Sequence, residues 1–175
     1  SVETTDSTAR ETPAGSTDYA TFVITRSGET DYSQPLTVYF QTSGTAGSPN
    51  DSSGAADYQL YNSNGYSIYQ TSYYDDGNYV YCYSVTIPAN VASTNVELRP
   101  TNDATKEDTE TVNLQLIATT AYNIDVNASQ ANATIDDNDH WSVSVEATDS
   151  TARETPAGST DYATFAITRS GETDY

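Results

Sequence analysis

The sequence predicts an all-β protein, an antiparallel immunoglobulin-like β-sandwich of about seven or eight strands arranged in a tandem array. Three observations carry this prediction. Apolar and polar residues alternate along most of the chain, turn residues recur between the alternating segments, and the opening of the chain returns almost unchanged at its end. No segment has the 3.6-residue period of an amphipathic helix. Short strands separated by regular turn signals are typical of a sandwich.

The internal repeat sets the domain boundary. Residues 1–32 return as residues 144–175 with two differences, where Thr4 and Val23 are replaced by Ala147 and Ala166. The offset of 143 residues is the size of a globular domain and too long for one unit of a helical solenoid. We therefore expect one sandwich repeat over residues 1–143 and the first strands of the next repeat over residues 144–175.

The alternation also assigns faces to the first long strand, at 19–26. Ala20, Phe22 and Ile24 share one face of this segment. The replacement of Val23 by Ala166 falls on the other face, and a core face tolerates the loss of two methyl groups poorly. The face of Phe22 and Ile24 is therefore expected to be the core. Further strands are expected, in order, at 36–41, 85–87, 96–98, 112–116 and 133–135.

Nine tyrosines crowd residues 58–83. The turn sequence Asp-Asp-Gly-Asn at 75–78 predicts that this segment is a long hairpin inserted in the domain. The hairpin either lies on its own domain or forms a contact surface for a neighbouring chain or repeat, where tyrosine is an enriched residue. The candidates for lateral contact are Tyr66, Tyr69, Tyr73, Tyr74 and Cys82. As the single cysteine of the chain, Cys82 is either a buried thiol or the donor of an intermolecular disulfide.

The composition excludes several classes of function. The chain has 25 acidic and 6 basic residues and a net charge of −19, which repels nucleic acid and anionic membranes. No run of about 20 apolar residues is present, so membrane insertion is not expected. The single histidine, His140, adjoins neither Cys82 nor a plausible nucleophilic serine, so the protein is not expected to be an enzyme. The acidity is explained either by bound cations or by adaptation to a saline medium, and the sequence does not separate the two.

The acidic residues gather where the predicted strands end. Glu11 and Asp57 stand at two such ends, and larger groups occupy residues 103–110 and 136–139. Loops meet at the two poles of a sandwich, so acids from several strands can converge there. Calcium takes six to eight oxygen ligands, and an all-oxygen set favours it over zinc or iron. Solvated loop acids are the alternative interpretation.

A series of short motifs runs through the first repeat in a fixed order. The motifs are Ala-Arg-Glu at 9–11, ATFVITRSG at 20–28, PLTVYF at 35–40, TSGTA at 42–46, ADY at 56–58, VTIPA at 85–89, Asn-Asp at 102–103, EDTETV at 107–112 and ATIDDND at 133–139. The series covers nearly the whole repeat. It resembles the Calx-beta domain, the calcium-binding sandwich of sodium–calcium exchangers and of many large extracellular adhesion proteins.

The resemblance implies a calcium site. The positions that match the ligands of the family are Glu11, Asp57, Asp103, Glu107, Asp137 and Asp139. Asn138 stands where the exchanger-type motif has a third acid, which implies fewer ions or weaker binding. The tyrosine-rich segment is a second departure, because it inserts residues between Asp57-Tyr58 and the Val-Thr-Ile-Pro motif at 85–88.

These observations together predict a calcium-binding structural repeat of a giant extracellular fibre or adhesin, in which Ca²⁺ stiffens the junctions between domains. Its expected partners are identical repeats in the same chain and in neighbouring chains, joined into a filament or cable. The alternative is a calcium-sensing or carbohydrate-binding module of a larger secreted or membrane-anchored protein. Near-identical repetition counts against a sensor, which needs one tuned site.

Overall fold

The computed structural model describes residues 1–175 except 13–16, 29–30, 50–55, 76 and 175. The chain divides into two compact units, of which the first comprises 1–103 with 107–137 and the second comprises 104–106 with 138–175. Strands dominate both, and the described part contains one short 3₁₀ turn, η1 (Val126–Ala128). Within the described residues no helix is long and apolar enough to cross a membrane.

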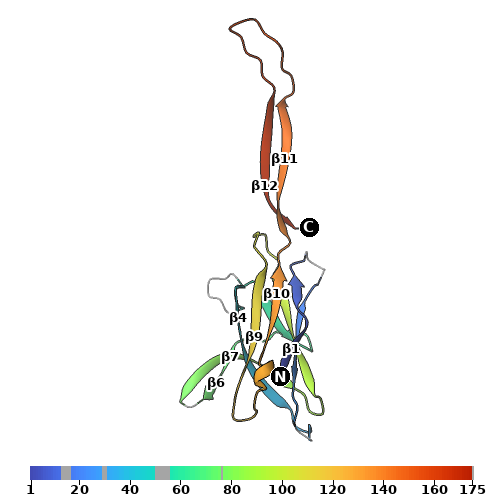
Figure 1. The fold of residues 1–175 in the computed structure, drawn as a ribbon, viewed down its shortest axis with the longest axis vertical. Helices are drawn as coiled ribbons and strands as arrows, with labels where there is room; N and C mark the ends of the chain where they lie inside the picture. Colours follow the sequence, from blue (N-terminus) through green and yellow to red (C-terminus); the bar gives the residue numbers. More distant parts are fainter. Residues whose placement is uncertain (13–16, 29–30, 50–55, 76, 175) are drawn as a thin grey trace. The chain divides into compact units, whose positions relative to one another are not determined.

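The first unit is a sandwich of two β-sheets (Figure 1). The four-stranded sheet has the order β1 (Val2–Asp6), β3 (Ala20–Thr25), β8 (Ser93–Pro100), β5 (Tyr58–Asn62). The six-stranded sheet has the order β2 (Thr8–Arg10), β10 (Gln130–Asp136), β9 (Glu110–Ile117), β4 (Leu36–Gly44), β7 (Asn78–Ile87), β6 (Thr71–Asp75). The all-β sandwich predicted from the alternation is confirmed, and the six expected segments all form strands.

The N-terminal segment serves both sheets. β1 pairs antiparallel with β3 and carries a bulge between Thr4 and Asp6, and a bulge bends a strand and re-aims it. The chain then crosses to the other sheet, where β2 pairs parallel with β10 and places Arg10 beside Asp136. The backbone N–H of Glu11 donates to the Asp136 carbonyl at 2.9 Å. This crossing fixes Glu11 at the end of β10.

The core is built by the period-two faces of the strands. Phe22 and Ile24 are buried on the inner face of β3, whereas Val23 between them is only partly buried. This confirms the face assignment drawn from the Val23 and Ala166 difference. Strands of both sheets contribute to the same hydrophobic cluster, whose largest fully buried members include Phe40, Leu98 and Leu114.

The tyrosine-rich segment is divided between the two sheets. Its first part, β5, pairs with β8, and Tyr58 is buried there with its hydroxyl donating to Thr42 Oγ1 at 2.9 Å. The chain then turns back on itself through an antiparallel bridge between Tyr61 and Ser67. β6 and β7 form the hairpin that follows, in which Thr71 pairs with Cys82. The insertion therefore protrudes over a shorter stretch than the tyrosine spacing predicts, because the burial of Tyr58 in the core ties down its beginning.

The side chains of this segment point in different directions. Cys82 is buried, with 1% of its surface exposed, so its thiol is removed from the candidate contact surface in this fold. Tyr73 is half-buried and its ring lies 4.8 Å from that of Tyr39. Five other tyrosines of this segment are exposed, namely Tyr66, Tyr69, Tyr74, Tyr79 and Tyr81.

The second unit contains a hairpin of β11 (Asp139–Asp149) and β12 (Thr164–Asp174). It reproduces the pairing of β1 with β3, because Val145 pairs with Ile167 as Val2 pairs with Ile24. The bulge also recurs, between Ala147 and Asp149. The two copies, which differ at only two positions, thus have the same register, as expected of a repeated strand pair.

Candidate metal centre

The acidic residues of the first unit occupy neighbouring strand ends. β2 and β10 end side by side, since Arg10 pairs with Asp136, and β9 begins there, since Glu110 pairs with Ile135. β5 begins beside the end of β8, where Tyr58 pairs with Pro100. The acids just outside these strand ends are Glu11, Asp57, Asp103, Glu107 and Asp137, with Glu110 as the first residue of β9.

Asp57 is held by backbone hydrogen bonds at the start of β5. Its N–H donates to the Gly47 carbonyl at 3.2 Å, and its carbonyl accepts from the Thr101 N–H at 2.8 Å. Its carboxylate accepts from the Gly47 N–H. These bonds tie Asp57 both to the loop that follows β4 and to the end of β8. The carboxylate is thereby fixed in place despite the long insertion that follows it.

A second set of bonds joins the loop before β9 to the end of β10. The Glu107 N–H donates to Asp137 Oδ2 at 2.7 Å. The Thr109 hydroxyl donates to Asp136 Oδ1 at 3.0 Å. These contacts link two loops that lie far apart in sequence and hold the Glu107 backbone beside the Asp137 carboxylate.

Two groups of carboxylates result from this arrangement. One oxygen each of Asp57, Glu107 and Glu110 lie within 4.8 Å of one another. A carboxylate oxygen of Glu11 lies within 4.8 Å of one of Asp137. Like charges at such distances repel strongly when they are removed from water. The arrangement is therefore unfavourable unless protons or a cation neutralise it.

The electrostatics of Glu11 reflect this repulsion. The pKa of Glu11 is raised to about 7, mainly by burial and in addition by the neighbouring charges of Asp103 and Asp137. Only 3% of its surface is exposed. Within the described part of the chain, its buried Oε2 has no hydrogen-bond partner. A buried anionic oxygen without a donor is costly and is a suitable ligand for a hard cation.

Glu110 behaves in the same way. The pKa of Glu110 is raised to about 7, mainly by burial and in addition by a hydrogen bond with the Asp57 carboxyl. Its Oε2 is also buried without a hydrogen-bond partner among the described residues. Sequence reasoning placed Glu110 in the acidic loop but not among the ligands. The Glu-x-x-Glu spacing from Glu107 is the signal that could have identified it.

The predicted ligands divide as follows. Glu11, Asp57, Asp103, Glu107 and Asp137 belong to the first unit, which brings them together. Asp139 is buried and is the first residue of β11, in the second unit. Its participation in the same site stays a prediction. Glu110 joins the group from the start of β9.

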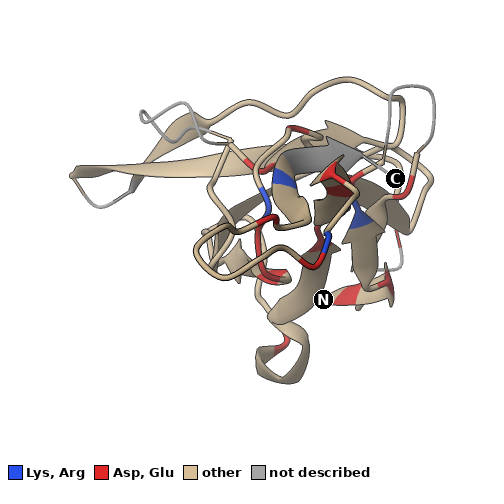
Figure 2. Cartoon of the chain, turned by 90° about the horizontal axis from the view of Figure 1, so that it is seen from above, with Lys and Arg blue, Asp and Glu red and all other residues tan. Residues whose placement is uncertain are grey.

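Acidic residues are also abundant elsewhere on the chain, and Figure 2 shows red segments in far greater number than blue ones. One basic residue, Arg10, lies at the edge of the centre and contacts Asp136 at 3.7 Å. It is exposed, and an exposed ion pair contributes little. The convergence of carboxylates, and not the overall acidity, distinguishes this end of the first unit.

No protein-family model and no curated protein matches the sequence. The structure is similar to a solved structure of the calcium-binding domain CBD12 of CALX1.1, with a TM-score of 0.44 and 16% identity, covering 79% of this chain and 44% of that chain. The chain thus spans less than half of the neighbour's length.

Proposed function

We propose that the first unit is a calcium-binding sandwich domain whose centre is formed by Glu11, Asp57, Glu107, Glu110 and Asp137, with Asp103 beside Glu11. The observation that carries this proposal is the pair of buried, unpartnered carboxylate oxygens on Glu11 and Glu110 at the meeting point of four other acids. A cation supplies the charge and the contacts that these oxygens lack. Asp139 is included as a further candidate ligand.

The donor set favours calcium over other metals. The ligands are carboxylates, and backbone carbonyls of the surrounding loops add further oxygens. Ca²⁺ accepts six to eight oxygens in a flexible geometry, whereas Mg²⁺ requires a near-ideal octahedron and retains its waters. Zinc and iron prefer nitrogen or sulfur ligands, and His140 and Cys82 belong to neither acid group.

We further propose that calcium stiffens the junction between successive domains. The division of the chain into two units falls directly beside three of the acids, after Asp103, before Glu107 and after Asp137. A metal that binds these residues restricts the chain at each point where it passes from one unit to the other. Binding of a ligand only to the folded site also stabilises the fold.

The near-identity of the two copies supports a role in an extracellular fibre or adhesin built of many such repeats. Identical domains have identical junctions, and equivalent contacts repeated along a chain produce a filament. The exposed tyrosines of the β6–β7 hairpin are the proposed lateral contact between such chains. Calcium sensing or carbohydrate binding in a larger secreted or membrane-anchored protein is the alternative.

Calorimetric titration and thermal melting of the full chain test the calcium proposal. We expect heat of binding with Ca²⁺, a higher melting temperature in Ca²⁺ than in chelator, and a much weaker response to Mg²⁺. The measurements are made at low and at high NaCl, because general screening of charge raises stability with any salt. Equal melting curves in calcium and in chelator at low salt would contradict the proposal.

Small-angle scattering of the same chain tests the stiffening. We expect the distribution of intramolecular distances to narrow when Ca²⁺ is added. A distribution that is unchanged at saturating calcium would leave a calcium-binding domain without a mechanical role. The two proposals can therefore fail separately.

A further inference from the structure

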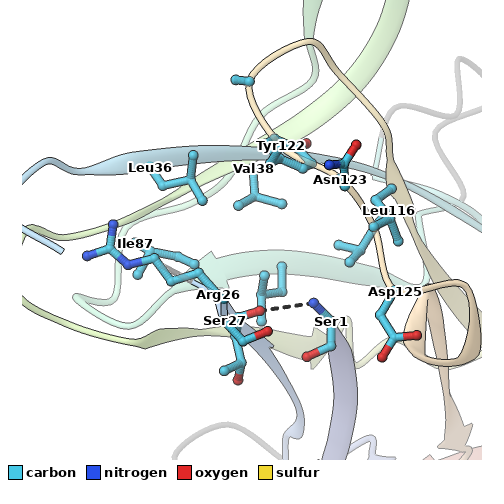
Figure 3. Close-up of a pocket in the computed structure, with 15 residues that line it drawn as sticks. Ser1, Arg26, Ser27, Leu36, Val38, Ile87, Leu116, Tyr122, Asn123 and Asp125 are labelled. Atoms are coloured by element: carbon cyan, nitrogen blue, oxygen red, sulfur yellow. Dashed lines mark hydrogen bonds between the residues drawn. The ribbon is translucent and has the colours of Figure 1, made fainter. Parts of the chain in front are cut away.

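A pocket opens in the first unit at the beginning of β1 (Figure 3). Its volume is about 390 Å³. Ile24 of the four-stranded sheet and Leu36, Val38, Ile87 and Leu116 of the six-stranded sheet give it an apolar interior. Ser1, Arg26 and Asp125 are among its polar lining. The pocket therefore reaches into the space between the two sheets, next to the first residue of the strand.

The β1 ladder reaches Ser1 with its hydrogen bonds intact. The Ser1 nitrogen donates to the Thr25 carbonyl, and the Thr25 N–H donates to the Ser1 carbonyl, both at 2.9 Å. In the second copy the equivalent ladder does not stop at Ser144. It continues with Val143 opposite Arg169 and Ser142 opposite Ser170. The residues that precede a copy thus extend its first strand.

Strand alternation decides which of these preceding residues faces the pocket. Val2 faces the core and is buried, so the residue two positions before it has the same orientation. In the second copy that residue is Val143, and its cross-strand partner is Arg169. Arg169 is the equivalent of Arg26, which lines the pocket. A valine at this position is therefore directed at the apolar interior.

Trp141 lies two residues before Val143 in the chain. The Arg169 guanidinium lies 4.0 Å from the centre of the Trp141 ring. The equivalent Arg26 guanidinium lies 4.5 Å from the Tyr32 ring and donates to four backbone carbonyls, those of Tyr32, Gln34, Pro88 and Val91. These bonds fix its plane in the pocket wall. A planar guanidinium has two faces, and Tyr32 covers one of them.

The same chain already holds a guanidinium between two aromatic rings. Arg99 lies 4.5 Å from the Tyr19 ring and 3.9 Å from the Tyr61 ring. Such contacts are favourable electrostatically and are stronger when water is excluded. The Tyr32 contact in one copy and the Trp141 contact in the other are thus the two halves of an arrangement that this chain forms at Arg99.

We propose that the pocket receives the tripeptide Trp-Ser-Val that precedes a copy of the repeat, as residues 141–143 precede Ser144. The valine occupies the apolar interior, and the tryptophan covers the second face of the Arg26 guanidinium. An apolar cavity of about 150 Å³ holds a benzene ring, so the volume suffices for the valine and part of the indole. Each repeat thereby inserts its last residues into the next sandwich, a joint that does not depend on calcium.

The test extends the full chain before Ser1, in a background in which Trp141→Phe removes the single native tryptophan. One variant adds Trp-Ser-Val. The matched control adds Trp-Val-Ser, which has the same composition but turns the valine to the solvent face. We expect Trp-Ser-Val to raise the melting temperature by about 4 °C or more over the unextended chain, and the control to raise it by much less. Both are measured in chelator.

Two spectroscopic measurements locate the added peptide. We expect blue-shifted tryptophan emission that is protected from acrylamide in the Trp-Ser-Val variant, and shifted methyl NMR signals for Val38 and Leu116. Equal melting temperatures in the two extended chains would overturn the proposal, since the gain would then be independent of which face the valine takes. Emission typical of exposed indole in the Trp-Ser-Val variant would overturn it as well.

Discussion

The acids at the end of the sandwich are coupled to one another through repulsion and through shared protons. A hydrogen bond with the Asp57 carboxyl adds to the effect of burial in raising the pKa of Glu110. Glu11 is buried beside Asp103 and Asp137. Without a cation, the fold therefore retains protons at Glu11 and Glu110 that the unfolded chain would release.

This coupling predicts a dependence of stability on pH. Burial raises the pKa of Glu11 and of Glu110 from 4.5 to about 7. The contribution of a raised pKa is fully present below pH 4.5 and is lost as the pH rises through about 7, because the folded state binds more protons than the unfolded state in that window. We expect the melting temperature in chelator to fall between pH 5 and pH 8.

Calcium should reverse this trend, since it competes with the same protons. We expect the affinity for Ca²⁺ to rise as the pH increases through about 7, with protons released on binding. Titration calorimetry in buffers of different ionisation enthalpy measures that release. Binding that is independent of pH between 5 and 8 would show that neither Glu11 nor Glu110 is a ligand.

Substitution of Glu110→Gln separates a metal ligand from a structural side chain. The substitution removes one charge from the cluster at nearly constant shape. We expect it to weaken Ca²⁺ binding by on the order of tenfold or more, and to leave the melting temperature in chelator equal or higher. Glu3→Gln, at an exposed acid of β1 outside the cluster, is the control and should leave binding unchanged. Loss of stability in chelator together with unchanged affinity would contradict this role.

At the scale of the strand, the repeat offers a natural pair of positions that share a sequence and differ in environment. Phe22 is fully buried in β3, whereas Phe165 in β12 has 65% of its surface exposed. Val2 and Val145 differ in the same way. A strand of this sequence therefore requires the rest of the sandwich to bury its apolar face, and a two-stranded hairpin alone is marginally stable.

This difference predicts opposite outcomes for the same substitution. Phe22→Ala should destabilise the first unit by about 3–5 kcal/mol, because it leaves a cavity in the core. Phe165→Ala should change the unfolding free energy of that unit by less than about 0.5 kcal/mol, as for an exposed side chain. Urea denaturation of the two variants measures both values. A large loss in the Phe165→Ala variant would show that β12 is buried in solution.

At the scale of the whole molecule, the exposed tyrosines are the proposed basis of self-association. Tyr79 in the β6–β7 hairpin and Tyr162 in the second unit have the same exposure, 70%. Substitution of Tyr162 is therefore a suitable control for substitution of Tyr79. If the hairpin is the lateral contact, Tyr79→Ser should weaken association by about thirtyfold, as expected for an aromatic anchor worth about 2 kcal/mol. Tyr162→Ser should have little effect. Sedimentation over a range of concentrations measures both effects. Equal weakening by the two substitutions would show that the β6–β7 hairpin is not the lateral contact.

The sequence by itself determined the local properties of this protein. Alternation gave the strands and their inner faces, as Phe22 and Ile24 illustrate, because the period of two is a property of the extended chain alone. The internal repeat gave the equivalence of β1–β3 and β11–β12. Acids at strand ends gave five of the residues that converge in the candidate centre, since strand ends meet at the poles of a sandwich.

Only the tertiary structure decided which strand ends meet and which side chains are enclosed there. The pairing of β5 with β8 removed Tyr58 from the hairpin, and the register of β9 against β10 brought Glu110 to Asp57. The burial that raises the pKa of Glu11 depends on residues from several distant segments. These features arise from contacts between parts of the chain far apart in sequence, whose register no local pattern specifies.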